Sequence, residues 1–221
     1  TTIVNAVVRI LEKKGLCIAL GAPTGRAAKR LSETTGRDAA TLHRLLEFTP
    51  KTGSFARNAT NPLEVDVLVV DEASMLDTML FAHVLAALPK SARLLLVGDV
   101  DQLPSVGPGR VLADVIAAKQ AWVVQLTEIF RQAAASSIVT NSHRINRGEM
   151  PSLAPDDRSD FFFIERDEPT EVLRIIEEMV ADRIPRRFQL DPILDVQVLS
   201  PMNRGVVGAH GLFPRRIELQ H

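Results

Sequence analysis

The sequence predicts an α/β fold in which a parallel β-sheet is flanked by helices, and three observations support this. Residues 67–70 and 94–97 are almost entirely aliphatic without alternation, which is typical of parallel strands covered on both faces. Residues 3–11 carry apolar side chains at helical spacing and precede a shorter apolar run. Both aliphatic runs lead into acidic residues, and ligands of open α/β sheets bind at the carboxyl ends of strands.

The N-terminal segment predicts a helix followed by a buried strand. The apolar residues of 3–11 share one helical face, and Gly15 is suited to end the helix. Residues 16–20 then form a short apolar run that stops at Gly21. This order of helix and strand fits a chain that builds its sheet from alternating elements.

Residues 47–61 leave this pattern and divide the first predicted strand from the second. Pro50, Gly53 and several Thr, Ser and Asn residues in this stretch predict a small hairpin. Two strands and two helices of a second unit are expected at residues 122–126, 196–199, 133–146 and 170–183. We therefore expect a first domain over residues 1–125 and a second over residues 126–221.

The composition indicates a globular protein of one or two domains. The chain has 221 residues, 46% of them apolar, which excludes disorder and collagen. It contains no run of about 18 consecutive apolar residues, so no membrane span is expected. Cys17 is the one cysteine, and a reducing cytoplasm is the expected location because a lone thiol cannot form a disulfide within the chain.

The net charge of -1 conceals an uneven distribution. Residues 24–44 carry five basic and two acidic side chains, residues 151–182 carry three basic and ten acidic ones, and residues 183–221 carry six basic and three acidic ones. Attraction of nucleic acid depends on where charges lie rather than on their sum. The alternative is that each such run is a solvated face.

The acidic strand ends suit nucleotide hydrolysis. A carboxylate such as Asp71 can hold Mg²⁺, and a neighbouring Glu72 can orient or deprotonate water. The alternative is a helix N-cap followed by a first-turn charge. After residues 94–97 comes Gly-Asp-x-x-Gln-Leu-Pro, in which the amide of Gln102 is suited to contact a terminal phosphate or its attacking water.

These residues belong to a set of motifs that resembles the RecD/TraA-like branch of superfamily 1 DNA helicases, the branch of the exodeoxyribonuclease V alpha subunit. The other stretches that carry the resemblance are residues 22–31 (APTGRAAKRL), 41–46 (TLHRLL), 126–132 (LTEIFRQ), 142–148 (SHRINRG) and 198–205 (VLSPMNRG). They follow the order of the family and span most of the chain.

The resemblance implies a RecA-like parallel sheet of the P-loop NTPase fold, with one near-complete lobe, part of a second lobe, and ATP and Mg²⁺ as cofactors. Asp71 resembles the Mg²⁺-coordinating acid, Glu72 the water-activating acid and Gln102 the γ-phosphate sensor. Arg131 resembles the arginine that reaches from the second lobe and stabilises transition-state charge. The alternative for Arg131 is a surface residue.

The resemblance also implies contacts with single-stranded DNA and with duplex DNA ends. The residues that match the DNA-contact motifs are Thr24, Gly25, Arg26, Thr41, His43, Pro201, Asn203 and Arg204. Residues 51–61 fall where the family carries its pin hairpin, where Phe55 would stack on a base pair and Lys51 or Arg57 would meet phosphate. The alternative for His43 is a histidine of the core.

The sequence has no Gly-x-x-x-x-Gly-Lys-[Ser/Thr] loop, which wraps the phosphates in this class of enzyme. Thr1 and Thr2 stand where the family continues after that Lys, so we expect one of their hydroxyls to bind Mg²⁺. The resemblance thus predicts a fragment without this loop and without the last two helicase motifs. Beyond Leu212, Phe213 departs from the Asn expected in the family.

We therefore predict part of an ATP-dependent DNA helicase or translocase of recombination and repair, moving 5′ to 3′ and inactive as this fragment alone. Nuclease or helicase subunits of a recombination complex are the implied protein partners. One alternative is a degenerate RecA-like module that binds DNA or a partner without hydrolysing ATP; the acids, Gln102 and Arg131 argue against it. Another is a kinase or GTPase, which fits the arginine-rich residues 24–44 poorly.

Overall fold

The computed structural model describes residues 2–126, 136–153 and 159–212. The chain forms two compact units, Thr1–Glu128 and Ile129–His221. Each unit is described by itself. Within the described residues, no helix has the length and apolar character needed to cross a bilayer.

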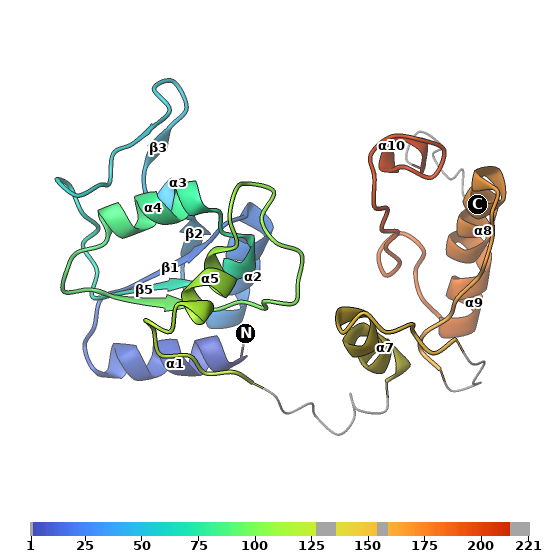
Figure 1. Cartoon of the computed structure of the whole chain (residues 1–221), viewed down its shortest axis with the longest axis horizontal. Helices are drawn as coiled ribbons and strands as arrows, with labels where there is room; N and C mark the ends of the chain where they lie inside the picture. The colour runs from blue at the N-terminus through green and yellow to red at the C-terminus, as the bar shows by residue number, and fades with distance from the viewer. Residues whose placement is uncertain (1, 127–135, 154–158, 213–221) are drawn as a thin grey trace. The chain divides into compact units, whose positions relative to one another are not determined.

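The first unit is built on a four-stranded parallel sheet (Figure 1). Its strands, in spatial order, are β2 (Ala39–Thr41), β1 (Ile18–Ala22), β5 (Val67–Val70) and β6 (Arg93–Leu96). The register pairs Ile18 with Val67 and Val67 with Arg93. The predicted parallel α/β fold is confirmed, and because all four strands run the same way, their carboxyl ends share one edge.

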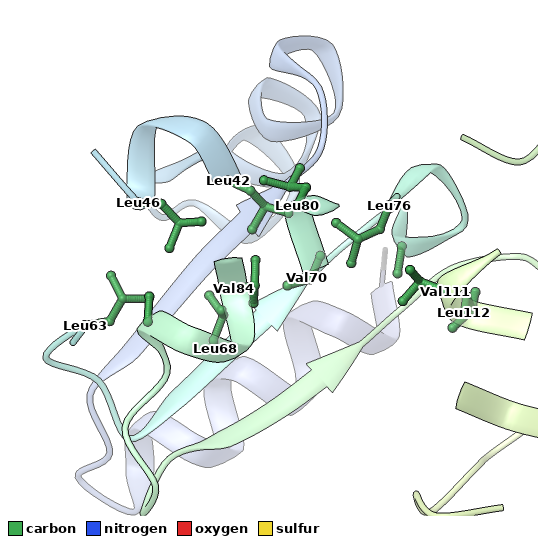
Figure 2. Close-up of a cluster of buried hydrophobic side chains, with 12 residues drawn as sticks. Leu42, Leu46, Leu63, Leu68, Val70, Leu76, Leu80, Val84, Val111 and Leu112 are labelled. Carbon is green, nitrogen blue, oxygen red and sulfur yellow. The ribbon is translucent and has the colours of Figure 1, made fainter. Parts of the chain in front are cut away.

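Helices cover both faces of this sheet. Helices α1 (Thr2–Lys13) and α2 (Gly25–Thr35) pack on one face, and α3 (Leu42–Leu45), α4 (Thr78–Ala87) and α5 (Val111–Ala117) on the other. Figure 2 shows the cluster of buried side chains on the face that α3, α4 and α5 cover. The side chains of β5 point alternately into the two clusters, which explains why the whole strand is aliphatic.

The helix predicted at the N-terminus ends as expected, but the following strand begins two residues later than predicted. Gly15 adopts a φ of 73°, a left-handed conformation that glycine takes without steric cost. The amide of Leu16 still donates to the carbonyl of Leu11, and the amide of Cys17 donates to the carboxylate of Asp66. The ladder with β5 therefore starts only at Ile18.

A two-stranded antiparallel hairpin follows α3, within the stretch for which a hairpin was predicted. It consists of β3 (Phe48–Thr49) and β4 (Ser54–Phe55), with Phe48 opposite Phe55. Figure 1 shows the hairpin projecting away from the sheet beside α3 and α4. Its role as a strand-separating pin remains a prediction.

The elements of the second unit that the structure describes are all helices, joined by long segments without regular secondary structure. Its elements are α7 (Ser137–Asn146), α8 (Pro169–Glu178), the π-helical segment η2 (Met179–Arg183), α9 (Ile184–Phe188) and α10 (Ala209–Leu212). Helices predicted over 133–146 and 170–183 are present where the structure describes them. The assignment of this unit as part of a second RecA-like lobe remains a prediction.

The two strands predicted at residues 122–126 and 196–199 are wrong, because neither described segment pairs with another strand. A strand needs a neighbour to take up its backbone hydrogen bonds, and an apolar run does not show whether one exists. Trp122 is fully exposed, whereas Val196 and Val198 line an apolar groove beside α8.

Packing of α2 on the sheet provides a test of the first core. Leu31 is completely buried, so we expect Leu31→Ala to lower the free energy of unfolding by ~2–5 kcal/mol. Leu103 is 87% exposed, and Leu103→Ala is the matched control with an expected change within ~0.5 kcal/mol. Denaturant unfolding measures both, and equal effects would contradict the described core.

Candidate functional site

The carboxyl edge of the sheet brings together most of the residues that the sequence singled out in the first unit. Thr24 follows β1, His43 lies just beyond β2, Asp71 follows β5 and Gly98 lies just beyond β6. Helix α1 begins on the same side, because it runs to the opposite edge before turning into β1 (Figure 1). Thr2 is therefore placed at the edge where the acids lie.

Asp71 is held at this edge by the sheet itself. Its amide donates to the carbonyl of Gly21 in β1 at 2.9 Å, and its Oδ1 accepts from the amide of Glu72 at 3.0 Å. Within the described residues its second carboxylate oxygen accepts no hydrogen bond, and no cluster of three or more metal-ligating side chains occurs. A single half-buried carboxylate with a free oxygen fits Mg²⁺, which is usually held by one or two carboxylates while keeping several waters.

Glu72 occupies a strained turn between β5 and the short helix η1 (Ala73–Met75). Its φ of 53° and ψ of 40° are left-handed, a conformation that costs a residue with a side chain about 1–2 kcal/mol. The next amide, of Ala73, donates to the carbonyl of Val97 at 2.9 Å, so contact with the neighbouring strand fixes the turn. Strain of this kind is concentrated at functional sites.

The geometry does not support the alternative that these two acids are helix caps. Glu72 precedes η1 but makes no capping hydrogen bond with its side chain. The cap of α4 is Asp77, whose Oδ1 accepts from the amide of Leu80 at 2.7 Å. Both acids thus remain available for other chemistry.

The loop after β6 packs directly against the turn that holds Glu72. A Cβ on Gly98 would lie 3.0 Å from the amide nitrogen of Ser74 and 3.1 Å from that of Ala73, so the two backbones touch. Asp99 organises the loop, since its Oδ1 accepts from the amide of Asp101 at 3.0 Å. Its Oδ2 lies 3.5 Å from Nε2 of Gln102, which places the predicted sensor side chain beside Asp99.

Ser74 is a residue of this site that the sequence analysis did not single out. Its Oγ is buried and has no hydrogen-bond partner within the described residues. Most buried polar side-chain atoms in folded proteins are hydrogen-bonded, so Oγ of Ser74 is an exception among the described residues. The small residue after the paired acids gave no sequence signal, because burial without a partner depends on the fold.

Helix α2 begins at the same edge, and Thr24 caps it. Its Oγ1 accepts from the amide of Ala27 at 3.2 Å, a capping role that the sequence analysis missed although a Thr before a helix is a typical signal. Gly25 faces open space, and Arg26 is exposed and forms no ion pair within the described residues. Arg26 is therefore free to meet an anion.

Not all of the basic residues predicted over 24–44 are free. Arg37 donates to the carboxylate of Glu12 in α1, and this ion pair raises the pKa of Arg37 and lowers the pKa of Glu12. The Nζ of Lys29 lies 3.8 Å from Oε1 of Glu33, one turn further along α2. Part of this charged stretch is thus paired within the chain at the surface, as the alternative of a solvated face predicts.

Thr41 is the N-cap of α3, and His43 lies within this short helix. Thr41 caps α3 as Thr24 caps α2, because the Oγ1 of Thr41 accepts a hydrogen bond from the amide of Arg44 at 3.2 Å. His43 is exposed, so the alternative of a core histidine is wrong. Its ring centroid lies 5.4 Å from that of Phe48 and 5.7 Å from that of Phe55.

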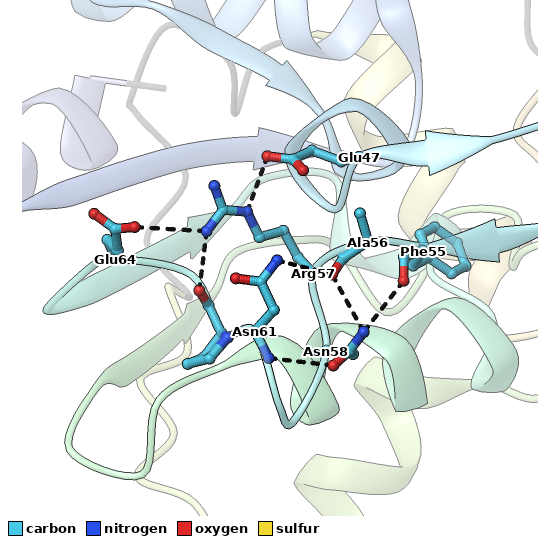
Figure 3. Close-up of polar contacts among 8 residues, drawn as sticks. Glu47, Phe55, Ala56, Arg57, Asn58, Asn61 and Glu64 are labelled. Carbon is cyan, nitrogen blue, oxygen red and sulfur yellow. Dashed lines mark hydrogen bonds and ion pairs between the residues drawn. The ribbon is translucent and has the colours of Figure 1, made fainter.

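The base of the hairpin is fixed by a polar network (Figure 3). Arg57 donates from Nε to Oε1 of Glu47 at 2.9 Å and from Nη1 to the carbonyl of Pro62 at 3.2 Å. Its Nη1 also lies 3.7 Å from Oε1 of Glu64, with which it forms an ion pair. The pairing with Glu47 raises the pKa of Arg57. The guanidinium is therefore occupied within the chain, and of the two predicted phosphate contacts only exposed Lys51 is left unpaired in the described structure.

Phe55 lies at the base of the hairpin rather than at its tip. Its ring is half-buried and packs against the core cluster and the rings of His43, Phe48 and His83. The structure thus uses Phe55 within the chain, and its predicted stacking on a base pair remains untested.

The three DNA-contact residues predicted in the second unit share a compact loop. Pro201, Asn203 and Arg204 are exposed, and the carbonyl of Asn203 accepts from the amide of His210. The hydroxyl of Ser200 donates to the carbonyl of Val207 at 2.8 Å and closes the loop. Thr1 and Arg131 lie outside the described residues.

Comparisons with known proteins agree with the motifs. The family model of the AAA domain matches residues 1–161. The chain is 41% identical over 208 residues to the ATP-dependent RecD2 DNA helicase of Deinococcus radiodurans, covering 94% of this chain and 27% of that protein. It is 42% identical over 139 residues to the RecBCD enzyme subunit RecD of Mycolicibacterium smegmatis, covering 52% of this chain and 25% of that subunit.

The chain thus spans about a quarter of the length of these relatives. Among solved structures, it is similar to Bacteroides Pif1 bound to ssDNA, with 19% identity and a TM-score of 0.41. That match covers 77% of this chain and 48% of the Pif1 chain.

The strain at Glu72 can be measured by itself. Because glycine adopts a left-handed backbone without steric cost, we expect Glu72→Gly to raise the free energy of unfolding by about 1 kcal/mol. Glu33→Gly, in the interior of α2, is the control and should lower it by about 0.5–1 kcal/mol. Denaturant unfolding that shows destabilisation by both changes would exclude strain at Glu72.

Proposed function

The chain belongs to the AAA domain family, and from that premise we propose that it forms part of the motor of an ATP-dependent DNA helicase or translocase. The observation that carries the proposal is the shared carboxyl edge. There the sheet gathers Asp71 and Glu72, the loop of Gln102 and the start of α2. The proposed site for hydrolysis thus lies beside an exposed arginine and half-buried threonine side chains suited to phosphate.

We propose ATP and Mg²⁺ as the cofactors. Asp71, with a hydroxyl of Thr1 or Thr2, would hold the metal, which when bound neutralises charge on the phosphates. Glu72 would orient the attacking water and accept its proton. Gln102 would contact the terminal phosphate, and Arg131 would stabilise the charge that develops on it.

Single-stranded DNA is the proposed polymer substrate. The hydroxyls of Thr24 and Thr41 accept backbone hydrogen bonds as helix caps, which leaves each O–H free to donate to a phosphate oxygen. Arg26 adds a cation beside the first cap. Gly25 and His43 complete this surface, and the loop of Pro201, Asn203 and Arg204 is the proposed contact of the second unit.

The whole protein would act in recombination and repair in the cytoplasm, moving 5′ to 3′ and separating duplex DNA at its ends. The relatives include a helicase and a subunit of the RecBCD enzyme, so assembly with nuclease or helicase subunits is part of the proposal. Residues 1–125 and 126–221 would then contribute to two lobes that alternate between closed and open states as ATP binds and is hydrolysed.

The hydrolytic role of Glu72 predicts a specific loss. In the whole gene product that contains these residues, Glu72→Gln should reduce single-stranded-DNA-dependent ATP hydrolysis by about 10²–10⁴-fold, because the amide cannot accept the proton. Nucleotide binding should be retained, and Glu33→Gln in exposed α2 is the matched control. Phosphate-release kinetics measure the rates; an unchanged rate would contradict the role of Glu72, and an inactive wild type would favour a non-catalytic binding module.

The proposed DNA surface predicts a change in salt dependence. Arg26→Ala should weaken binding of single-stranded DNA for all sequences and reduce the salt slope of binding by about 1, because one phosphate contact is lost. Lys90 lies between α4 and β6, at the opposite edge of the sheet, so Lys90→Ala should change neither quantity. Fluorescence anisotropy at several salt concentrations distinguishes the two variants, and identical slopes would place the DNA elsewhere.

A further inference from the structure

His83 is a residue of α4 that none of the proposed chemistry uses, yet its ring contacts the hairpin. The ring centroids of His83 and Phe55 lie 4.4 Å apart with an interplanar angle of 40°. We infer that His83 is a positioning residue that docks the β3–β4 hairpin on α4. Given the proposed function, we further infer that this docking holds the hairpin rigid while duplex DNA is separated.

The ring of Phe55 links three elements of the first unit. It meets Phe48 across the hairpin at 5.0 Å, His43 of α3 at 5.7 Å and His83 of α4 at 4.4 Å. Both histidines are exposed, so these contacts lie at the surface rather than within the core. They are therefore contacts that a substitution can remove without unfolding the unit.

The polar network at the hairpin does not reach α4. Arg57 joins Glu47 to Glu64, and Asn58 bonds the carbonyls of Phe55 and Ala56 (Figure 3). These bonds fix the two ends of the hairpin to each other and to the chain that leads into β5. Beyond the hairpin, the amide of Leu63 donates to the carbonyl of Ala87 in α4 at 2.8 Å. The contacts of the hairpin strands themselves with α4 are the ring contact and the packing of Phe55 against the core cluster.

Helix α4 is itself fixed to the candidate site. The short helix η1 comes directly after Glu72, and α4 begins three residues after η1 ends. The amide of Thr78 in α4 donates to the carbonyl of Pro108 at 2.9 Å. Pro108 belongs to the loop that contains Gln102. Docking on α4 therefore places the hairpin in a constant position relative to both loops of the proposed ATP site.

A rigid hairpin base has a mechanical consequence. The tip around Lys51 is exposed, and it can oppose a duplex only if its base does not yield. Without the His83 ring, ATP hydrolysis and movement on single strands should continue, because no residue proposed for them is changed. Fewer base pairs should then be separated for each ATP hydrolysed.

The first test measures docking without reference to activity. In His83→Ala, amide hydrogen exchange over residues 47–57 should be about two- to tenfold faster, the range expected for loss of an aromatic pair. His83→Phe restores a ring and should return exchange close to the wild-type rate. Leu85→Ala is the control on the same helix, since residues two positions apart do not share a face; unchanged exchange in His83→Ala would overturn the docking.

The second test uses the whole gene product and a forked duplex. His83→Ala should lower base pairs unwound per ATP by about two- to tenfold while hydrolysis stimulated by single-stranded DNA stays unchanged, and His83→Phe should recover most of the loss. Faster exchange with unchanged unwinding would overturn the role in strand separation. A wild type that neither unwinds nor hydrolyses ATP would instead refute the proposed function and with it that role, while the exchange measurement still decides the docking.

Discussion

The parallel register of β5 between β1 and β6 is the constraint on which the rest of the first unit depends. It places Val67 opposite both Ile18 and Arg93, so that all three strands finish at one edge. Residues separated by dozens of positions in sequence thus meet without any direct side-chain bond between them. An antiparallel neighbour would have sent one of these loops to the far edge of the sheet.

The strained turn at Glu72 follows from the same register. Because Val97 continues beyond β6, its amide bonds to Val70 and its carbonyl accepts from Ala73, which pins the backbone on both sides of the two acids. Gly98 then allows the two loops to touch, where any side chain would separate them. The geometry of Glu72 is therefore imposed by neighbouring strands, and local preference alone would not produce it.

This dependence explains what the sequence could and could not predict. Strands buried on both faces produce continuous aliphatic runs, so β5 and the acids after it were predictable from residues 67–72 alone. The predicted strand at 122–126 failed because pairing requires a partner, which an apolar run does not reveal. The contact of Phe55 with His83 joins a hairpin to a distant helix, and nothing in the local sequence around either residue indicates it.

Adjacent strands β1 and β2 are each followed by a helix capped by a Thr, and the local charge there bears on the proposed binding of an anionic polymer by a chain of net charge -1. Each strand leads to a capping Thr and then to a helix with no acidic residue in its first turn. Arg26 follows the first cap, at the positive end of α2, where a cation is unfavourable. A phosphate beside Arg26 would remove that penalty, and the hydroxyl of Thr24 would bind it as well. The local arrangement, rather than the total charge, thus supports DNA as the ligand of this edge.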